Sequence, residues 1–234
     1  HRDYAQAETR TLLSALFATL RQARWVDPIE RVHRAHHKLL QLEVAQRAGF
    51  LVPDTLSTND PVAARRFFDA HPAIVTKMLN AISFQDDGTE QMVFTSVVTE
   101  AHLSALDGLR HCPAVFQEKI EKDVELRVAV VGRRLFVASV TAEPGSAGAV
   151  DWRQDPKLAY RFRPARLPAE VEACVHRVMD EFGLSYGSFD IIRRPDGAHV
   201  FLEVNSAGEW MWLAEMVGLP IAEALAELLV ERPG

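Results

Sequence analysis

The chain has 234 residues, of which 48% are hydrophobic and 25% are charged, the composition of an ordinary globular protein. Its formal net charge of -6 provides no general basic field, so neither nucleic acid nor an anionic membrane surface is expected as a partner. No apolar run approaches the roughly 18 to 20 residues that a membrane span needs. The two cysteines, Cys112 and Cys174, form no metal or disulfide motif, which favours buried, inert thiols and a reducing cytoplasm.

The first part of the chain predicts two helices. Residues 4–24 carry leucine and phenylalanine at helical spacing, and a second helix is expected over about 29–48, with Gly49 as its C-terminal cap. The chain begins at His1 rather than Met and enters a helical pattern at once, so we interpret it as the later portion of a longer protein. The second helix carries three histidines whose spacing favours a solvated basic face over metal ligation: His33, His36 and His37.

The next segment alternates short strands with helices. Asp60 is placed to cap a helix at its first turn, and Asp86-Asp87-Gly88 marks a turn or mobile loop. The sequence predicts strands at residues 50–55, 73–77 and 92–97, a helix at 61–70 and a short helix at 99–106. A polar loop is expected at residues 85–91.

The remainder of the chain is dominated by strands that turn back on themselves. Gly132-Arg133 and Arg194-Pro195-Asp196-Gly197 are turn signals that join neighbouring strands into hairpins. Because helices and antiparallel hairpins are mixed, the predicted fold class is α+β rather than an alternating doubly wound sheet. The expected strands are 113–117, 125–131, 135–141, 186–192 and 199–205, and the expected helices are 168–182, 210–217 and 221–231.

The densest group of polar residues lies on the last hairpin. Glu203 and Asn205 are two apart on a strand and therefore share a face. A turn centred on residues 195–196 pairs Ser188 with Glu203 and puts Asp190 diagonally beside it, whereas a three-residue loop shifts the register by one and separates them. If the side chains converge, two carboxylates and an amide oxygen form a hard oxygen site suited to Mg²⁺ and phosphate oxygens. The alternative is a hairpin with solvated polar residues.

Two other segments carry charge beside apolar strands. Lys77 follows the apolar strand residues 73–76, so the strand backbone would hold its ammonium group in place to contact a phosphate. The alternative is an ordinary surface lysine at the end of a strand. Residues 116–120 can offer backbone hydrogen bonds to an adenine edge. Glu125, which shares a strand face with Arg127, can accept hydrogen bonds from ribose hydroxyls. The chain contains no P-loop, GxGxxG, GxSxG or HExxH motif.

Taken in order, these residues resemble the ATP-grasp superfamily. Lys38 precedes a helix that ends in Ala48-Gly49-Phe50-Leu51-Val52-Pro53-Asp54-Thr55, similar to the family's Lys-helix-Gly-x-x-x-Pro-x-Thr segment, and Lys77 is similar to its second lysine. The order of the matches over residues 38–205 makes the resemblance specific. The further matches are Gln117-Glu118-Lys119-Ile120 at the adenine hinge, Glu125 at the ribose position, and Asp190, Glu203 and Asn205 at the Mg²⁺ ligands.

Within that superfamily the chain is most similar to the maturases of graspetide and microviridin-type ribosomal peptides, which are related to the ribosomal-protein S6 glutamate ligases. The family has an N-terminal domain of about a hundred residues before the Lys38 helix, and almost all of it is absent here. The segments that carry this resemblance are Glu125-Leu126-Arg127-Val128, Asp151-Trp152-Arg153, Leu184-Ser185-Tyr186-Gly187, residues 203–212 and Gly218-Leu219-Pro220-Ile221.

The resemblance implies an ATP-grasp fold with ATP bound between two subdomains. The small lid subdomain would be residues 50–112 and the C-terminal antiparallel-sheet subdomain residues 113–234, with residues 1–49 as a helical remnant of the N-terminal domain and linker. The implied roles are phosphate binding by Lys38 and Lys77, adenine binding by Gln117, Glu118, Lys119 and Ile120, ribose binding by Glu125, Mg²⁺ ligation by Asp190, Glu203 and Asn205, and stabilisation of an acyl phosphate by Arg127 and Arg153.

The implied activity is ATP-dependent ligation of a precursor peptide. A carboxylate is phosphorylated, and a hydroxyl or amine then displaces phosphate, which joins Asp or Glu side chains to Ser, Thr or Lys side chains as macrocyclic esters or amides. Two alternatives stay open: an amino-acid or glutamate ligase of the S6-modification kind, and a non-catalytic module that binds ATP or peptide. The identity of the peptide, the bond type, activity without the N-terminal domain and the oligomeric state, a homodimer included, also stay open.

A set of cations could form a recognition patch for an acidic peptide on a chain that is acidic overall, with ordinary solvated side chains as the alternative. These cations are Arg110, Arg133, Arg134, Arg153 and Lys157.

Overall fold

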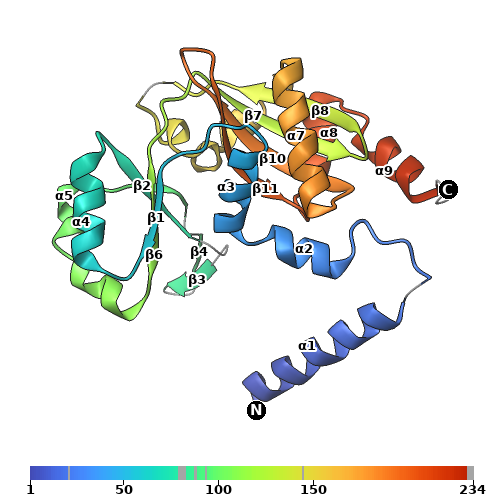
Figure 1. Cartoon of the computed structure of the whole chain (residues 1–234), viewed down its shortest axis with the longest axis horizontal. Coiled ribbons are helices and arrows are strands. Elements are labelled where there is room, and N and C mark those ends of the chain that lie inside the picture. The colour runs from blue at the N-terminus through green and yellow to red at the C-terminus, as the bar shows by residue number, and fades with distance from the viewer. Residues whose placement is uncertain (21, 79–82, 87–88, 93, 144, 231–234) are drawn as a thin grey trace.

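The computed structural model describes residues 1–20, 22–78, 83–86, 89–92, 94–143 and 145–230. Figure 1 shows two bodies of sheet and helix beside one another, one built on a larger sheet and one on a smaller sheet. The mixture of helices with antiparallel sheets confirms the predicted α+β class. Among the described residues, no helix has the length and apolar character needed to cross a membrane.

The larger sheet is antiparallel and is buried on both faces. Helices α3 (Lys38–Arg47) and α7 (Ala169–Phe182) share one apolar cluster with it, and α6 (Pro156–Ala159), α8 (Met211–Val217) and α9 (Ile221–Val230) share a second. The two clusters draw on alternate residues of one strand, Val128 and Val130 against Ala129 and Val131, as the pleat of a strand requires. The strand order is β11 (His199–Asn205), β10 (Tyr186–Arg193), β7 (Val124–Val131), β8 (Arg134–Val140) and β9 (Arg163–Pro164).

The smaller sheet has the order β1 (Thr55–Thr58), β6 (Ala114–Glu118), β2 (Ile74–Lys77) and β5 (Ser96–Val97). Its core is formed with α4 (Pro61–Ala70), α5 (Glu100–Leu103) and the 3-10 helix η1 (Leu106–His111). The cap predicted for Asp60 is confirmed, since its side chain accepts a hydrogen bond from the Val62 N–H at 2.9 Å. The strand β6 was expected in the C-terminal subdomain that begins at residue 113. Because β6 pairs with β1 and β2, we now propose the division between residues 118 and 124.

The polar stretch 85–91 contains regular structure where a loop was expected. Strands β3 (Ser83–Asp86) and β4 (Thr89–Met92) pair as a hairpin, with Asp86 opposite Thr89. The strand expected over 92–97 is correspondingly interrupted, because Met92 belongs to β4 and only residues 96–97 form β5. The turn residues 87–88 lie outside the described residues.

The N-terminal helices differ from the prediction at one point that matters for the site. Helix α1 (Arg2–Thr19) buries no residue, and in Figure 1 it extends away from both sheets. The single helix expected over 29–48 is two helices, α2 (Ile29–Ala35) and α3, because His37 adopts an extended conformation. The break places Lys38 at the first position of a new helix instead of in the middle of a long one.

Several local predictions hold and one fails. Gly132-Arg133 forms the tight turn expected between β7 and β8, with Val131 opposite Arg134 and Gly132 at a positive φ of 58°. The predicted burial is confirmed for the Cys174 thiol but is wrong for Cys112, which is exposed where η1 ends. Short 3-10 turns at Ala147–Ala149 (η2) and Trp152–Gln154 (η3) complete the loop beside the cleft.

Candidate active site

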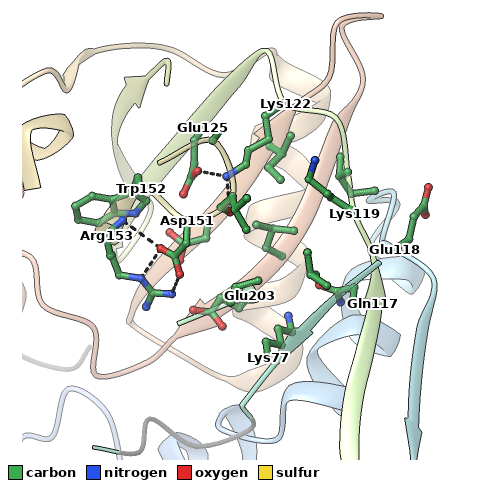
Figure 2. Close-up of a pocket in the computed structure, with 18 residues that line it drawn as sticks. Lys77, Gln117, Glu118, Lys119, Lys122, Glu125, Asp151, Trp152, Arg153 and Glu203 are labelled. Atoms are coloured by element: carbon green, nitrogen blue, oxygen red, sulfur yellow. Dashed lines mark hydrogen bonds and ion pairs between the residues drawn. The ribbon is translucent and has the colours of Figure 1, made fainter. Parts of the chain in front are cut away.

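A pocket lies between the two sheets, and most of the predicted site residues line it (Figure 2). The smaller sheet contributes strands β2 and β6, and the larger sheet contributes β7, β10 and β11. Nine predicted residues are in the lining: Lys77, Gln117, Glu118, Lys119, Ile120, Glu125, Arg153, Asp190 and Glu203. Three are outside the lining itself: Lys38, Arg127 and Asn205.

The β10–β11 hairpin brings the two predicted carboxylates together by a different register from the one expected. Asp190 lies directly opposite Glu203, and Ser188 pairs with Asn205 rather than with Glu203. The loop between the strands shifts the pairing by one residue from the expected register, since Arg193 pairs with His199. On its own, this shift would place the two carboxylates on opposite faces of the hairpin. A bulge at Leu202 shifts the register by one more residue and restores the shared face.

Each carboxylate of this pair is bound by a different cation. The Lys38 Nζ lies 2.9 Å from Oε2 of Glu203, and Arg127 forms an ion pair with Asp190 across β7 and β10. Burial opposes ionisation of Glu203, but Lys38 and Lys77 outweigh it and lower its pKa to about 2. Burial raises the pKa of Asp190, a shift that Arg127 opposes and Glu203 reinforces.

Lys77 faces the same carboxylates from the smaller sheet. Burial lowers the pKa of its ammonium, while the nearby charges of Glu203 and Asp190 act in the opposite direction. Lys77 makes no ion pair with any described residue, and Figure 2 shows it beside Glu203 at the inner end of the pocket. Two ammonium groups from different bodies, Lys38 and Lys77, therefore flank one carboxylate.

The predicted adenine hinge connects β6 with the larger sheet. The backbone N–H of Glu118 donates to Asp54 at 2.9 Å and that of Lys119 to Ala73 at 3.0 Å, so both donors are already used. The buried Gln117 side chain donates to Oγ1 of Thr55 at 2.9 Å. The Glu118 side chain points away from Lys77 and Glu203 in Figure 2. The hinge can therefore present Lys119 and Ile120 to a ligand more directly than Glu118.

The sequence did not identify the apolar walls of the pocket. Val75, Ile192 and Leu202 line it from three different strands and form surfaces suited to a flat, apolar ring. In the sequence these residues are ordinary strand residues, and nothing distinguishes them from core positions.

Glu125 is held by a lysine that sequence reasoning also missed. The Lys122 Nζ lies 2.7 Å from Oε2 of Glu125 and donates to the Val150 carbonyl at 2.9 Å. Burial raises the pKa of Glu125, while Lys122 acts to lower it. The lysine thus fixes Glu125 against the loop that closes the outer side of the pocket.

The two arginines predicted to stabilise an acyl phosphate both lie next to the carboxylates. The Arg127 Nε is buried and has no hydrogen-bond partner among the described residues. Arg153 is held by Asp151, with Nε and an Nη of Arg153 at 2.8 and 2.7 Å from the two carboxylate oxygens. Hydrogen bonding to Asp151 raises the pKa of Arg153, and despite burial the charge of Asp190 raises that of Arg127. Both guanidinium groups therefore carry positive charge at neutral pH.

The predicted metal ligands form a small oxygen-donor set. Asn205 is two residues from Glu203 on β11, and its Oδ1 accepts a hydrogen bond from the Ala207 N–H at 3.1 Å. Within the described ranges, no cluster of three or more His, Cys, Asp or Glu side chains is placed to hold a metal, and this covers His33, His36 and His37. Two facing carboxylates with a nearby amide fit Mg²⁺, which takes few protein ligands and completes its shell with phosphate oxygens and water.

Four of the five cations suggested as a peptide-recognition patch, Arg110, Arg133, Arg134 and Arg153, are each paired with a separate acid. Arg133 pairs with Asp180 on α7 at 2.7 Å, and Arg134 pairs with Glu227 on α9 at 2.8 Å. Arg110 belongs to η1 beside the smaller sheet. These contacts give no support to a single patch.

Comparison with known proteins agrees with this fold. No family model matches the sequence. The structure of an ATP-grasp ligase associated with a ribosomally synthesised, modified peptide (RiPP) from Chryseobacterium gregarium, in complex with ADP and a leader and core peptide, matches with a TM-score of 0.92 and 33% identity, covering 100% of this chain and 72% of that one. The macrocyclase MdnC from Microcystis aeruginosa MRC, bound with the precursor peptide MdnA, matches with a TM-score of 0.87 and 37% identity over 98% of this chain and 70% of that one.

A curated sequence relative is more distant. The tetrahydromethanopterin:alpha-L-glutamate ligase of Methanocaldococcus jannaschii is 29% identical over 100 residues, which span 42% of this chain and 34% of that protein. These likenesses, with the two-sheet cleft, define an ATP-grasp fold and an enzyme of the ligase class. The chain belongs to the RiPP-associated ATP-grasp ligases.

Proposed function

We propose that this chain is an ATP-dependent ligase that activates side-chain carboxylates of a ribosomally made precursor peptide and joins them to hydroxyl or amine side chains as macrocyclic esters or amides. The observation that carries the proposal is the group formed by two carboxylates of the pocket, Asp190 and Glu203, with four nearby cations. Lys77 and Arg153 line the pocket, and Lys38 and Arg127 pair with the carboxylates from outside the lining. Such a concentration of positive charge on an acidic chain suits an anionic phosphate chain.

The nucleotide would lie along the pocket, with its base toward β6 and its phosphates toward β11. Of the predicted hinge residues, Gln117, Lys119 and Ile120 would line the adenine edge between the apolar walls, while the Glu118 side chain points away. Glu125 would accept hydrogen bonds from the ribose, and Lys38 and Lys77 would neutralise the phosphates. Lys122 supports this role for Glu125, because it fixes the carboxylate without using both of its oxygens.

Mg²⁺ would be held by Asp190, Glu203 and Asn205, and when bound it supplies charge neutralisation of the phosphate oxygens. The pKa of about 2 keeps the Glu203 carboxylate ionised and available as a ligand at neutral pH. In the structure Arg127 and Lys38 each pair with one of these two carboxylates, so both acids have a cationic partner beside the pocket.

Arg127 and Arg153 would act on the transferred phosphoryl group. A substrate carboxylate oxygen bonds to the γ-phosphorus while the bond to the β,γ-bridging oxygen breaks, which gives an acyl phosphate and ADP. A hydroxyl or amine then attacks the acyl carbon, and phosphate leaves as the nucleophile loses its proton. The unpartnered Nε of Arg127 suits a contact to an oxygen that gains charge during this transfer.

The peptide partner is proposed from the relatives whose structures contain leader, core or precursor peptides. An amino-acid ligase is the second candidate, since the curated relative is named a glutamate ligase. A cytoplasmic location, where ATP is supplied, is part of the proposal, and a homodimer stays a prediction.

The deciding experiment incubates the chain with ATP, Mg²⁺ and the precursor peptide encoded beside its gene, and follows the peptide by mass spectrometry. Each ring formed removes one water from the peptide mass. Addition of glutamate to a peptide or small acceptor would instead favour the second candidate. Loss of ATP without either product would refute ligation.

A further inference from the structure

Gln41 is a fully buried polar residue, and it lies outside the pocket beside β11. Its relative exposure is 0%, and its side-chain amide makes three hydrogen bonds. Oε1 accepts from the Val204 N–H at 3.0 Å, and Nε2 donates to the Val204 carbonyl at 2.7 Å. Nε2 also donates to the Ala35 carbonyl at the end of α2. A buried amide with both of its polar atoms used in this way fixes its neighbours tightly.

The strand that Gln41 holds is an edge strand. β11 has β10 on one side only, so alternate N–H and C=O groups of β11 face outward without a partner strand. The N–H and C=O groups of Val204 form one such outward-facing pair. The side-chain amide of Gln41 makes the two hydrogen bonds with them that a neighbouring strand would make. A second attachment lies further along the edge, where the Phe201 N–H donates to the Leu51 carbonyl at 2.9 Å. The bulge at Leu202 lies between these two attachments.

The same helical turn that carries Gln41 also carries Lys38. Residues three apart lie on one face of a helix, and here both side chains reach β11. Lys38 binds the side chain of Glu203, and Gln41 binds the backbone of the next residue, Val204. Figure 1 shows α3 next to β11, as these contacts require.

We infer that Gln41 is a positioning residue for the phosphate and metal end of the site. Its amide fixes the β11 backbone between Glu203 and Asn205 relative to the helix that presents Lys38. This inference rests on the proposed function. It predicts that loss of the amide weakens Mg²⁺-dependent binding of the triphosphate selectively, because the adenine hinge and its walls belong largely to other strands.

A control of the same kind lies on the neighbouring strand, at the start of β10. Asp27 is also buried, also belongs to the N-terminal segment, and accepts hydrogen bonds from the Ser185 and Tyr186 N–H groups at 2.8 to 3.0 Å. It therefore attaches the same segment to the start of β10, four residues before Asp190. Asp27→Asn removes a comparable attachment without touching β11.

The test compares the wild type with Gln41→Met and Asp27→Asn by calorimetric titration. A non-hydrolysable ATP analogue with Mg²⁺ and, separately, adenosine are the ligands. Gln41→Met should lower the affinity for the analogue with Mg²⁺ by about 10-fold or more, the scale of losing buried hydrogen bonds. The affinity for adenosine should fall much less, because Leu202 is the one apolar wall residue named above that belongs to β11. Asp27→Asn should lower the melting temperature and change neither affinity. If Gln41→Met does not fold, Gln41→Asn offers the same amide one methylene short of Val204 and should give the same selective loss.

Hydrogen exchange gives a readout that is independent of nucleotide. Amides of residues 200–206 should exchange faster in Gln41→Met than in Asp27→Asn at equal overall stability. Equal loss of both ligands, unchanged binding of the analogue, or the same selective loss in Asp27→Asn overturns the inference. A wild type that binds the analogue without any dependence on Mg²⁺ overturns the proposed function instead, and the two failures are thereby distinguished.

Discussion

Asp190 and Glu203 lie directly opposite each other on neighbouring strands, yet they are held by cations from different elements. Glu203 is bound by Lys38 at the start of α3, and Asp190 by Arg127 on β7. Because neighbouring carboxylates repel one another when both are ionised, the two ion pairs offset this repulsion. A divalent ion bound between the two carboxylates would also offset their repulsion. Lys38 and Arg127 could then contact phosphate.

Removing either carboxylate should therefore abolish turnover. In Asp190→Ala or Glu203→Ala the metal loses a ligand and a cation next to it loses its partner. We expect a fall in kcat of at least about 1,000-fold, the scale of several kcal/mol of lost electrostatic stabilisation. Steady-state measurement of ADP release checks this, with Glu215→Gln, an exposed position on α8, as the control. Full activity in Asp190→Ala refutes the metal assignment.

The features of the fold and the site that could be predicted from the sequence are those determined by neighbouring residues in the chain. The cap at Asp60, the Gly132-Arg133 turn and the shared strand face of Glu203 and Asn205 each depend on a few consecutive residues. Lys77 and the hinge were proposed from their own segments as well as from the resemblance, Lys38 from the resemblance alone, and the pocket contains Lys77 and residues 117–120. Polar composition alone wrongly predicted a loop at residues 85–91, since residues 85–86 and 89–91 belong to strands.

The parts that were missed depend on contacts between distant segments. The break between α2 and α3 coincides with a bond from Gln41 to the Ala35 carbonyl, and Gln41 is in turn fixed by β11. The bulge at Leu202 likewise lies between two attachments made from outside the hairpin. The spacing of hydrophobic residues within one helix or strand cannot predict contacts with residues that are distant in the sequence.

Lys77 and Glu125 should separate the phosphate end of the nucleotide from the ribose. Lys77→Met removes a charge that only the phosphates can use, so it should weaken ATP far more than adenosine. Glu125→Ala removes a hydrogen-bond acceptor for a group present in both ligands, so it should weaken both equally, by about 10-fold for a charged hydrogen bond. Calorimetric titration of each variant with both ligands checks this.

The control for these titrations is Lys157→Met, which removes an exposed lysine outside the pocket lining and should change neither affinity. The reverse pattern, with adenosine lost in Lys77→Met and only ATP lost in Glu125→Ala, would mean that the nucleotide is bound in the opposite direction.

Arg127 should act on the rate rather than on nucleotide binding. Arg127→Lys keeps the charge beside Asp190 but loses the planar group whose Nε has no partner in the described part of the chain. We expect kcat to fall by about 100- to 1,000-fold, as when one donor to developing charge is removed, with the affinity for ATP little changed. Arg133→Lys, at an exposed ion pair, is the matched control. A rise in the Michaelis constant for ATP at unchanged kcat contradicts the role.

Tyr186 should make the fold sensitive to alkaline pH. Its buried hydroxyl donates to the Gly208 carbonyl at 2.7 Å, which fixes the loop that follows Asn205. Burial raises the pKa of Tyr186 from 10.0 to about 12, against a smaller opposing effect of Arg127. Because the folded state holds this proton more tightly than the unfolded chain, the stabilisation is complete below about pH 10 and is lost as pH rises toward 12.

Tyr186→Phe should therefore lower the free energy of unfolding near neutral pH by about 1 to 3 kcal/mol, since the Gly208 carbonyl loses its donor. It should also flatten the alkaline loss of stability, because no hydroxyl remains to ionise at that position. Urea unfolding at about pH 8 and about pH 11, together with ultraviolet absorbance of tyrosinate, measures both effects. Tyr160→Phe, at a side chain that is 72% exposed, should leave both unchanged. If wild type and Tyr186→Phe lose stability in parallel between the two pH values, Tyr186 is not the group responsible.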